Sequence, residues 1–393
     1  MFDTILKLFS YSLINTFLAL AMILLIKAFY IVGKATRYNM LMLSDTLTII
    51  LMTFIASFRY GFGSDYFQYL GLSEAYPKIF PNIKYLFQGS VIREYAYQIG
   101  FPLLSVVSNK IFNNKYAIFF VVACIIYIPL LLYVRKKSPC VFYSLCVYIF
   151  FGLWGFSLNI LKQAIAMIFI CFAYEALKKK KIISYIMLCL CGVIFHSTAL
   201  LAGLGLIVAL FIKPTFKSLN ICIIAGVVLR SAATIAIRFL TRFSVFSRYY
   251  KRYYDGTTIG IDRTFVPIGV IIETLFVLYI LYLAIKDRRL LRNVVPDIDT
   301  YISIVMISIP FSILGISRVL WLANRFAKFF LQFLIILVPT LMIQNKEAVK
   351  NRPLLIKLDR TFVILLMLFV WHFLYSSLML DNNSFTIDFL FFQ

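Results

Sequence analysis

Long apolar runs restrict the fold of this chain more than any other feature of its sequence. A helix of about 20 apolar residues crosses the hydrocarbon layer of a bilayer, and 62% of the 393 residues are hydrophobic while only 14% are charged. A water-soluble domain cannot bury that much apolar surface. The runs are continuous rather than alternating, which favours helices over barrel strands. We therefore expect an all-α, polytopic transmembrane bundle that forms a single membrane domain over residues 1–393.

Clusters of basic residues between the runs predict the topology. The positive-inside rule places such clusters in cytoplasmic loops, and this puts both termini and the long segments 58–115 and 241–265 outside. The apolar stretch 97–112 is then expected to be a re-entrant or interfacial helix on the outer side, since a crossing there would reverse every later loop. About twelve spans are expected, near residues 8–32, 39–57, 116–134, 139–156, 160–177, 182–196, 197–212, 218–240, 266–286, 300–317, 326–343 and 361–380.

The net charge of +23 follows from these loops and does not indicate nucleic-acid binding. Basic loops of this kind contact anionic membrane lipids. The seven cysteines lie in or beside apolar runs, and no loop carries a pair suited to a disulfide framework or a metal site. We expect neither a metal nor a cofactor.

The segment from 58 to 69 contains the first group of candidate site residues. It follows an apolar run and combines Arg59 with two glycines, Asp65 and a group of tyrosines. Glycine permits backbone angles that other residues avoid. An interfacial ion pair between Arg59 and Asp65 is the alternative explanation. Later segments, however, bring polar groups back to the same side of the membrane, which favours a site.

The outer side carries more arginine than the positive-inside rule explains. Arginine binds phosphate oxygens through a planar fork of donors, so several arginines together would suit a diphosphate. Arg238 and Arg242 are four residues apart, and Arg318 and Arg325 are seven apart, so each pair would share one face of a helix. Contacts with anionic lipid head groups are the alternative explanation.

Asn159, Lys162 and Gln163 have the spacing of one polar face at the first turn of the span expected at 160–177. The N–H groups of a helix N-terminus favour an anion there, although hydrogen bonds between spans would use the same residues. His196 falls at the outer turn between two short spans, where it could act as a base or pack between helices. Charge considerations favour His196 as the base and Asp65 as a residue that positions Arg59 or an acceptor hydroxyl.

With these motifs in view, the chain resembles the EpsG-like family of polysaccharide polymerases, the Wzy-type proteins of bacterial surface-glycan assembly. One departure is Lys162, where the family usually carries arginine; lysine lacks the bidentate fork. The resemblance adds Tyr66, Tyr69 and Glu94 to the expected substrate-binding residues. The matching elements are residues 58–66 with Tyr69, Glu94 with Tyr97, Asn159 to Gln163 with Ala166, and Phe195-His196-Ser197.

The resemblance implies polymerisation of undecaprenyl-diphosphate-linked oligosaccharide repeat units on the outer face of the cytoplasmic (inner) membrane. The product would be an O-antigen, a capsule or an exopolysaccharide. The lipid-linked donor and acceptor, membrane lipids and a chain-length regulator protein are the expected partners. Arginines in a site walled by hydrocarbon would stabilise the charge that develops on the diphosphate, without a metal.

Two other classes of protein fit the same composition. A lipid-linked oligosaccharide flippase would also use cations within the membrane, but it would be expected to show internal repeats and helices interrupted at matched positions. A membrane O-acyltransferase acting on the same glycan would need its histidine near a cytoplasmic acyl donor. The predicted topology places His196 on the opposite side.

Overall fold

The computed structural model describes residues 2–35, 39–63, 65–94, 98–240, 268–316 and 322–348, together with residues 364, 368, 369, 388 and 389. This part of the chain is helical apart from one pair of two-residue strands. The elements, in chain order, are α1 (Phe2–Ala35), α2 (Asn39–Phe58), β1 (Arg59–Tyr60), α3 (Tyr66–Ile79), the 3-10 helix η1 (Ile83–Phe87), α4 (Gly89–Glu94), α5 (Gly100–Phe112), α6 (Ala117–Lys137), α7 (Val141–Phe150), α8 (Leu153–Asn159), α9 (Leu161–Lys178), α10 (Ile182–Phe195), α11 (Ala199–Phe211), α12 (Phe216–Leu240), α14 (Ile268–Lys286), α15 (Arg288–Val294), α16 (Ile298–Gly315), α17 (Leu322–Leu331), α18 (Leu334–Ala348) and β2 (Asp388–Phe389).

The described helices confirm an all-α chain with the character of a multi-pass membrane protein. Among them, α6, α12, α14 and α16 contain segments long and apolar enough to cross a membrane, and the bent pairs α7–α8 and α17–α18 raise the number from four to six. Shorter apolar segments occur in α1, α2, α10 and α11. The expected number of about twelve spans is not confirmed, and the span expected at 361–380 lies largely outside the described residues.

Two of the expected spans, near 139–156 and 326–343, correspond to bent pairs of helices. The first consists of α7 and α8, which meet at an angle of 58°, and the second of α17 and α18, which meet at 50°. Gly152 explains the first bend, because its φ of 83° lies in the left-handed region that ends a regular helix. The second bend follows a two-residue turn at Gln332 and Phe333.

The two spans expected at 182–196 and 197–212 are a hairpin of short helices. α10 has 14 residues and α11 has 13. Each is shorter than the about 20 residues that a helix needs to cross the hydrocarbon layer. The hairpin begins after a run of lysines that precedes α10, and it ends before Pro214, which follows α11. His196 ends α10 at the turn, where its backbone is extended.

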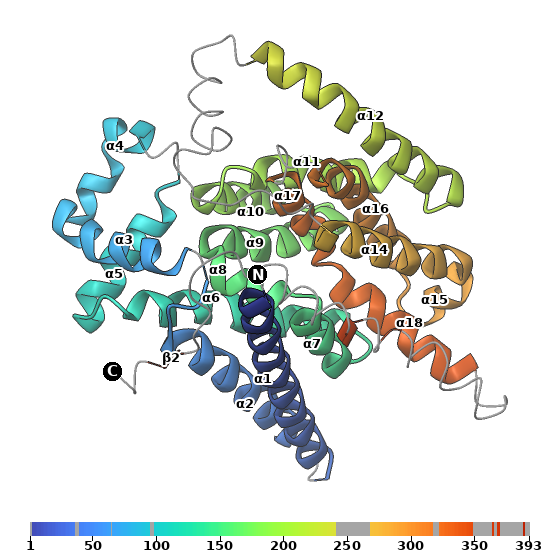
Figure 1. Ribbon diagram of the computed structural model, residues 1–393, viewed down its shortest axis with the longest axis horizontal. Coiled ribbons are helices and arrows are strands. Elements are labelled where there is room, and N and C mark those ends of the chain that lie inside the picture. The colour runs from blue at the N-terminus through green and yellow to red at the C-terminus, as the bar shows by residue number, and fades with distance from the viewer. Residues whose placement is uncertain are drawn as a thin grey trace.

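α9 is the central helix of the bundle (Figure 1), where it packs against α6, α8, α10 and α11. α3, α4 and α5 lie on one side of it, and α14, α15, α16 and α18 lie on the other. α12 lies at the edge, packed on α16, and most of its apolar side chains face outward. The core between these helices is rich in aromatic rings, such as those of Tyr174, Tyr301 and Phe333.

Ion pairs join the helices at the end that carries the basic loops. Lys137 at the end of α6 pairs with Glu175 in the last turn of α9, and Lys178 pairs with Asp297 just before α16. The opposite end of α9 begins at Leu161, which is about 27 Å away for 18 residues at 1.5 Å per residue. Among the described residues, these ion-paired basic loops therefore lie at the C-terminal end of α9.

Candidate functional site

Arg59 anchors the segment that follows α2. Its side chain is only 3% exposed. Nη1 donates to the carbonyl oxygen of Ala56 near the end of α2, and Nη2 donates to that of Leu158 at the end of α8, at 2.8 Å. The guanidinium carbon also lies 4.7 Å from the centre of the Phe119 ring. Because a cation is favourable at the C-terminus of a helix, Arg59 holds the ends of α2 and α8 together.

The burial of Arg59 and Tyr66 does not fit the expectation that they contact substrate. Burial lowers the pKa of Arg59 to about 10, which still leaves it charged at neutral pH. Tyr66 is fully buried and stacks on Phe119, with the ring centres 4.7 Å apart. Both side chains therefore contact the protein interior, at the end of α2 and at the start of α3.

Two glycines shape this segment, and the second fits against α8. Gly61 and Gly63 have φ values of 66° and 99°. A Cβ atom on Gly63 would lie 2.9 Å from Oδ1 of Asn159, closer than side-chain atoms normally approach. The same Oδ1 accepts a hydrogen bond from the backbone N–H of Asp65, at 3.0 Å. Glycine at 63 therefore allows Asn159 to hold Asp65 at the start of α3.

The expected polar face of Asn159, Lys162 and Gln163 is not a single face. Asn159 ends α8, and Ile160, with φ −110° and ψ 67°, interrupts the helix before α9 begins. Gln163 is buried and donates through Nε2 to the carbonyl oxygen of Arg325, at 2.6 Å. The prediction failed because it assumed one continuous helix. The residues instead connect α8 with α3 and α9 with α17.

Five polar side chains from separate segments come together beside this junction. Charges among them act on Tyr69, Lys162 and His196, in addition to the effect of burial. Burial and the charge of Asp65 raise the pKa of Tyr69. The charge of Arg325, and backbone N–H groups in the first turn of α9, oppose this rise. The pKa of His196 is lowered to about 4 by burial and by the positive charges of Arg325 and Lys162. We call this group the polar cluster; its members are Asp65, Tyr69, Lys162, His196 and Arg325.

His196 lies at the turn of the α10–α11 hairpin. Its Nδ1 is 2.7 Å from Oγ1 of Thr198. The neighbouring Ser197 accepts a hydrogen bond from Nε2 of Gln98, at 3.2 Å, which joins the turn to the residues before α5. With a pKa of about 4, His196 is neutral at physiological pH and can accept a proton.

Tyr69 is the most buried member of the polar cluster, and it lies against the backbone of Lys162. Tyr69 is buried, and the backbone N–H groups of Leu161 and Lys162 act on its hydroxyl. The N-terminus of α9, expected as an anion site, therefore faces this phenol. Nζ of Lys162 lies 5.3 Å from the centre of the Phe101 ring, and the side chain is half-buried. Asp65, His196 and Arg325 are also half-buried, so the cluster is partly open.

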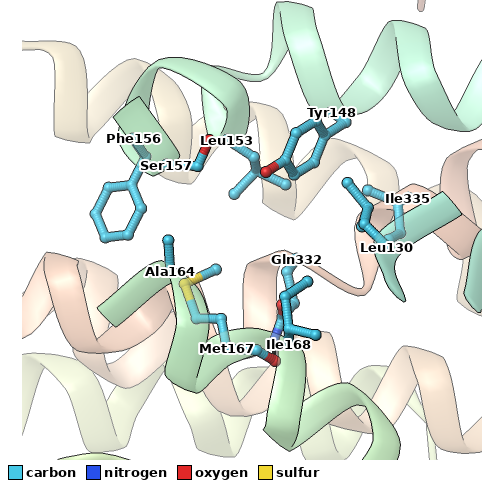
Figure 2. A pocket seen from close by; sticks show the side chains of 10 residues that line it. All are labelled: Leu130, Tyr148, Leu153, Phe156, Ser157, Ala164, Met167, Ile168, Gln332 and Ile335. Atoms are coloured by element: carbon cyan, nitrogen blue, oxygen red, sulfur yellow. Dashed lines mark hydrogen bonds between the residues drawn. The ribbon is translucent and has the colours of Figure 1, made fainter. Parts of the chain in front are cut away.

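A small cavity lies deeper, where the two bent helix pairs meet (Figure 2). Its volume of about 10 Å³ has room for about one water molecule and not for a sugar. Its polar lining includes Tyr148, Ser157 and Gln332, among apolar side chains from α6, α8, α9 and α18. None of its lining residues belongs to the polar cluster, and the cavity is too small to be a substrate site.

Several expected site residues cannot be placed in the polar cluster. Arg242 and Arg318 lie outside the described residues. The described backbone places Arg238 near the end of α12 and Glu94 at the end of α4. Their predicted roles in substrate binding stay predictions.

The sequence interpretation missed a buried ion pair beneath the polar cluster. Nζ of Lys328 on α17 lies 2.5 Å from Oε1 of Glu273 on α14. Both residues stand within apolar runs, and a charged side chain there usually has a partner or a functional role. This position could have indicated the pair from the sequence. Gln98 was missed as well, and nothing in its sequence context distinguished it.

Comparison with known proteins gave one match. A family model described as the EpsG family matches residues 42–387, which include every member of the polar cluster. The comparisons with curated proteins and with solved structures gave no match.

Gly63→Ala tests the contact between Gly63 and Asn159 of α8. The new methyl group would meet Asn159 and would also strain a backbone with positive φ, so we expect a loss of function together with a loss of about 1–2 kcal/mol of stability. Gly71→Ala is the matched control, because no atom lies within 4 Å of that Cβ position. Thermal unfolding of the purified variants measures the difference. Equal melting temperatures would contradict the contact.

A titration of His196 tests the electrostatics of the polar cluster. The chain has two histidines, so ¹⁵N NMR of a His372→Gln variant reports on His196 alone. We expect a midpoint near pH 4, well below the usual 6.5. Between these values the unfolded chain binds a proton that the folded chain does not, so stability falls as the pH drops through this window. A midpoint near 6.5 would show that the ring is neither buried nor close to the cations.

Proposed function

The chain belongs to the EpsG family, which is linked to exopolysaccharide biosynthesis, and we propose that it polymerises undecaprenyl-diphosphate-linked oligosaccharide repeat units. The observation that carries the proposal is the polar cluster, in which a neutral histidine lies beside two cations. This is the combination that glycosyl transfer from a lipid diphosphate requires: a group that accepts a proton and groups that neutralise a phosphate leaving group.

In the proposed reaction, a hydroxyl of the acceptor unit attacks the anomeric carbon of the donor glycan. The new C–O bond forms as the bond from the anomeric carbon to the diphosphate oxygen breaks. That oxygen keeps the electron pair, and undecaprenyl diphosphate leaves. The proton of the attacking hydroxyl passes to His196, whose lowered pKa keeps the ring neutral at physiological pH but makes it a weaker base than a free imidazole.

Arg325 and Lys162 would stabilise the charge that grows on the departing diphosphate. Arg325 offers the planar fork that binds two phosphate oxygens at once, whereas Lys162 supplies a single charged donor. Both lower the pKa of His196, so both are close to the group proposed as the base. Burial beside hydrocarbon strengthens these charge interactions relative to water.

Asp65 and Tyr69 would orient the acceptor. Asn159 fixes the backbone of Asp65, and the carboxylate acts on both Tyr69 and Lys162. A carboxylate in this position can accept a hydrogen bond from a sugar hydroxyl and align it for attack. Arg59, in this arrangement, contributes by holding α2 and α8 beneath Asp65.

The position of the polar cluster agrees with a reaction at the outer face. The cluster lies at the N-terminal end of α9, and the paired basic loops lie at the C-terminal end. Basic loops are cytoplasmic in most membrane proteins. The hairpin that carries His196 exposes apolar side chains such as Leu190, Leu201 and Leu204. A polyprenyl chain could therefore remain in the bilayer while its diphosphate reaches the cluster.

A deletion strain complemented with variants tests the proposal. We expect the deletion strain to accumulate single repeat units on the lipid acceptor. His196→Gln and Arg325→Ala should fail to restore polymer, with rate losses of roughly a hundredfold or more, and Arg325→Lys should restore only part. Arg289→Ala, an exposed arginine on α15, is the matched control and should restore polymer fully.

The glycan of the deletion strain also separates the other functions. Absence of all surface glycan would indicate a flippase, and full-length polymer that lacks acyl groups would indicate an acyltransferase. Polymer of normal length from the His196→Gln variant, with the protein present in the membrane, would remove His196 from the mechanism.

A further inference from the structure

A buried ion pair lies one helical turn away from the polar cluster. Lys328 and Glu273 are 3% and 1% exposed, and their Nζ and Oε1 atoms are 2.5 Å apart. Glu273 stands within the apolar helix α14, and Lys328 follows Arg325 on α17 by three residues. Residues three apart lie on neighbouring positions of a helix surface. The pair therefore holds the part of α17 that carries Arg325.

The ammonium group of Lys328 also reaches the bend between α7 and α8. It lies 5.2 Å from the centre of the Phe151 ring, and Phe151 directly precedes Gly152. α8 leads from that bend to Asn159, which holds Asp65. Lys328 of α17 thus contacts both α14 and the bend between α7 and α8. It therefore connects the two bent helix pairs.

α17 is otherwise seated by contacts that resist shifts along its axis. The carbonyl oxygen of Arg325 accepts from Gln163, and Nε2 of Gln332 donates to the carbonyl oxygen of Met167, at 3.1 Å. Two glycines on neighbouring helices allow a close approach: a Cβ atom on Gly315 would lie 2.8 Å from Asn324, and one on Gly205 would lie 2.5 Å from Phe330. These contacts hold α17 against α9, α16 and α11, whereas the ion pair joins it to α14.

The ion pair is too deep to bind substrate. Both side chains are almost fully buried, and Oε2 of Glu273 has no hydrogen-bond partner within the described residues. An apolar pair of similar volume often gives equal or greater stability than a buried ion pair. Stability alone therefore does not explain charges at these two positions, whereas a directional contact between helices does.

We propose that Glu273 and Lys328 are a positioning pair, which sets α17 so that Arg325 lies close to His196, whose ring packs 6.5 Å from that of Phe329 on the same helix. The proposal rests on the proposed function, because Arg325 is the diphosphate ligand there. Neither residue contacts substrate in this proposal; the pair acts by fixing the position of Arg325. Since Arg325 contributes most when the leaving group gains charge, a shift of α17 lowers kcat more than it changes KM.

A pair of apolar substitutions tests the proposal. The protein is purified with Glu273→Leu and Lys328→Met together, and elongation is measured with lipid-linked repeat units extracted from the deletion strain. We expect a melting temperature equal to or above that of the wild type, a kcat lower by about tenfold to a hundredfold, and little change in KM. The exchanged pair, Glu273→Lys with Lys328→Glu, should recover part of kcat. Glu74→Gln with Lys78→Gln, an exposed pair on α3, is the control and should change nothing.

A second measurement does not depend on activity. Spin labels on cysteines introduced at Leu275 of α14 and Leu322 of α17 report the distance between the helices by electron paramagnetic resonance, in a background without the native cysteines. We expect the distance distribution to broaden in the apolar variant and to narrow again in the exchanged pair.

The two readouts separate the two claims. A wild-type kcat in the apolar variant, or a distribution that does not broaden, overturns the positioning role. A wild-type protein that does not elongate the extracted units overturns the proposed function, and the distance distribution then still decides whether the pair sets the position of α17. If the apolar variant does not accumulate in the membrane, the exchanged pair decides: recovered protein with recovered elongation supports the role, and recovered protein without elongation contradicts it.

Discussion

A buried guanidinium between two helix ends is the interaction on which the candidate site depends. Arg59 donates to the carbonyl oxygens of Ala56 and Leu158, and these mark the ends of α2 and α8. Carbonyl groups at a helix end have no partner within the helix, so they must find one elsewhere when they are buried. One charged side chain satisfies both ends. It thereby brings residues 99 positions apart into contact, and Gly63, which follows Arg59, packs against Asn159 at the end of α8.

The rest of the site follows from that contact. Asn159, at the end of α8, holds the backbone of Asp65. The interruption after Asn159 lets α9 start with Lys162 in its first turn, and Gln163 reaches from α9 to the backbone of α17, which carries Arg325. Lys162 and Arg325 of the polar cluster thus lie on helices that begin or end at an interruption, whereas Asp65 and His196 lie on short connections. Half-helices seated in a packed bundle place charged groups more rigidly than surface loops do.

The sequence predicted the membrane class and the positions of the long apolar helices, because apolar runs are local signals, but it did not predict α3, α4 or α15. It named all five residues of the polar cluster as candidates, because isolated polar residues beside apolar runs are also local signals. It did not predict the bends, since a single glycine such as Gly152 is compatible with both a straight and a broken helix. Arg59 was expected to face substrate, but its direction depends on Leu158, which is 99 residues away. The Glu273–Lys328 pair is a contact between distant helices, and no pattern within either run reveals its partner.

The melting temperatures of two purified variants, Arg59→Met and Arg325→Met, test the central claim most directly. Arg59 is a structural anchor in this account, and its loss leaves two helix ends without a charged donor, which costs about 1.5–3 kcal/mol per hydrogen bond. Arg325 is half-buried in the polar cluster, and this account assigns it to the diphosphate rather than to the packing of two helix ends. We therefore predict a clear drop in melting temperature for Arg59→Met and none for Arg325→Met, with polymer lost in both. An unchanged melting temperature for Arg59→Met, together with loss of polymer, would contradict the account and make Arg59 a substrate ligand.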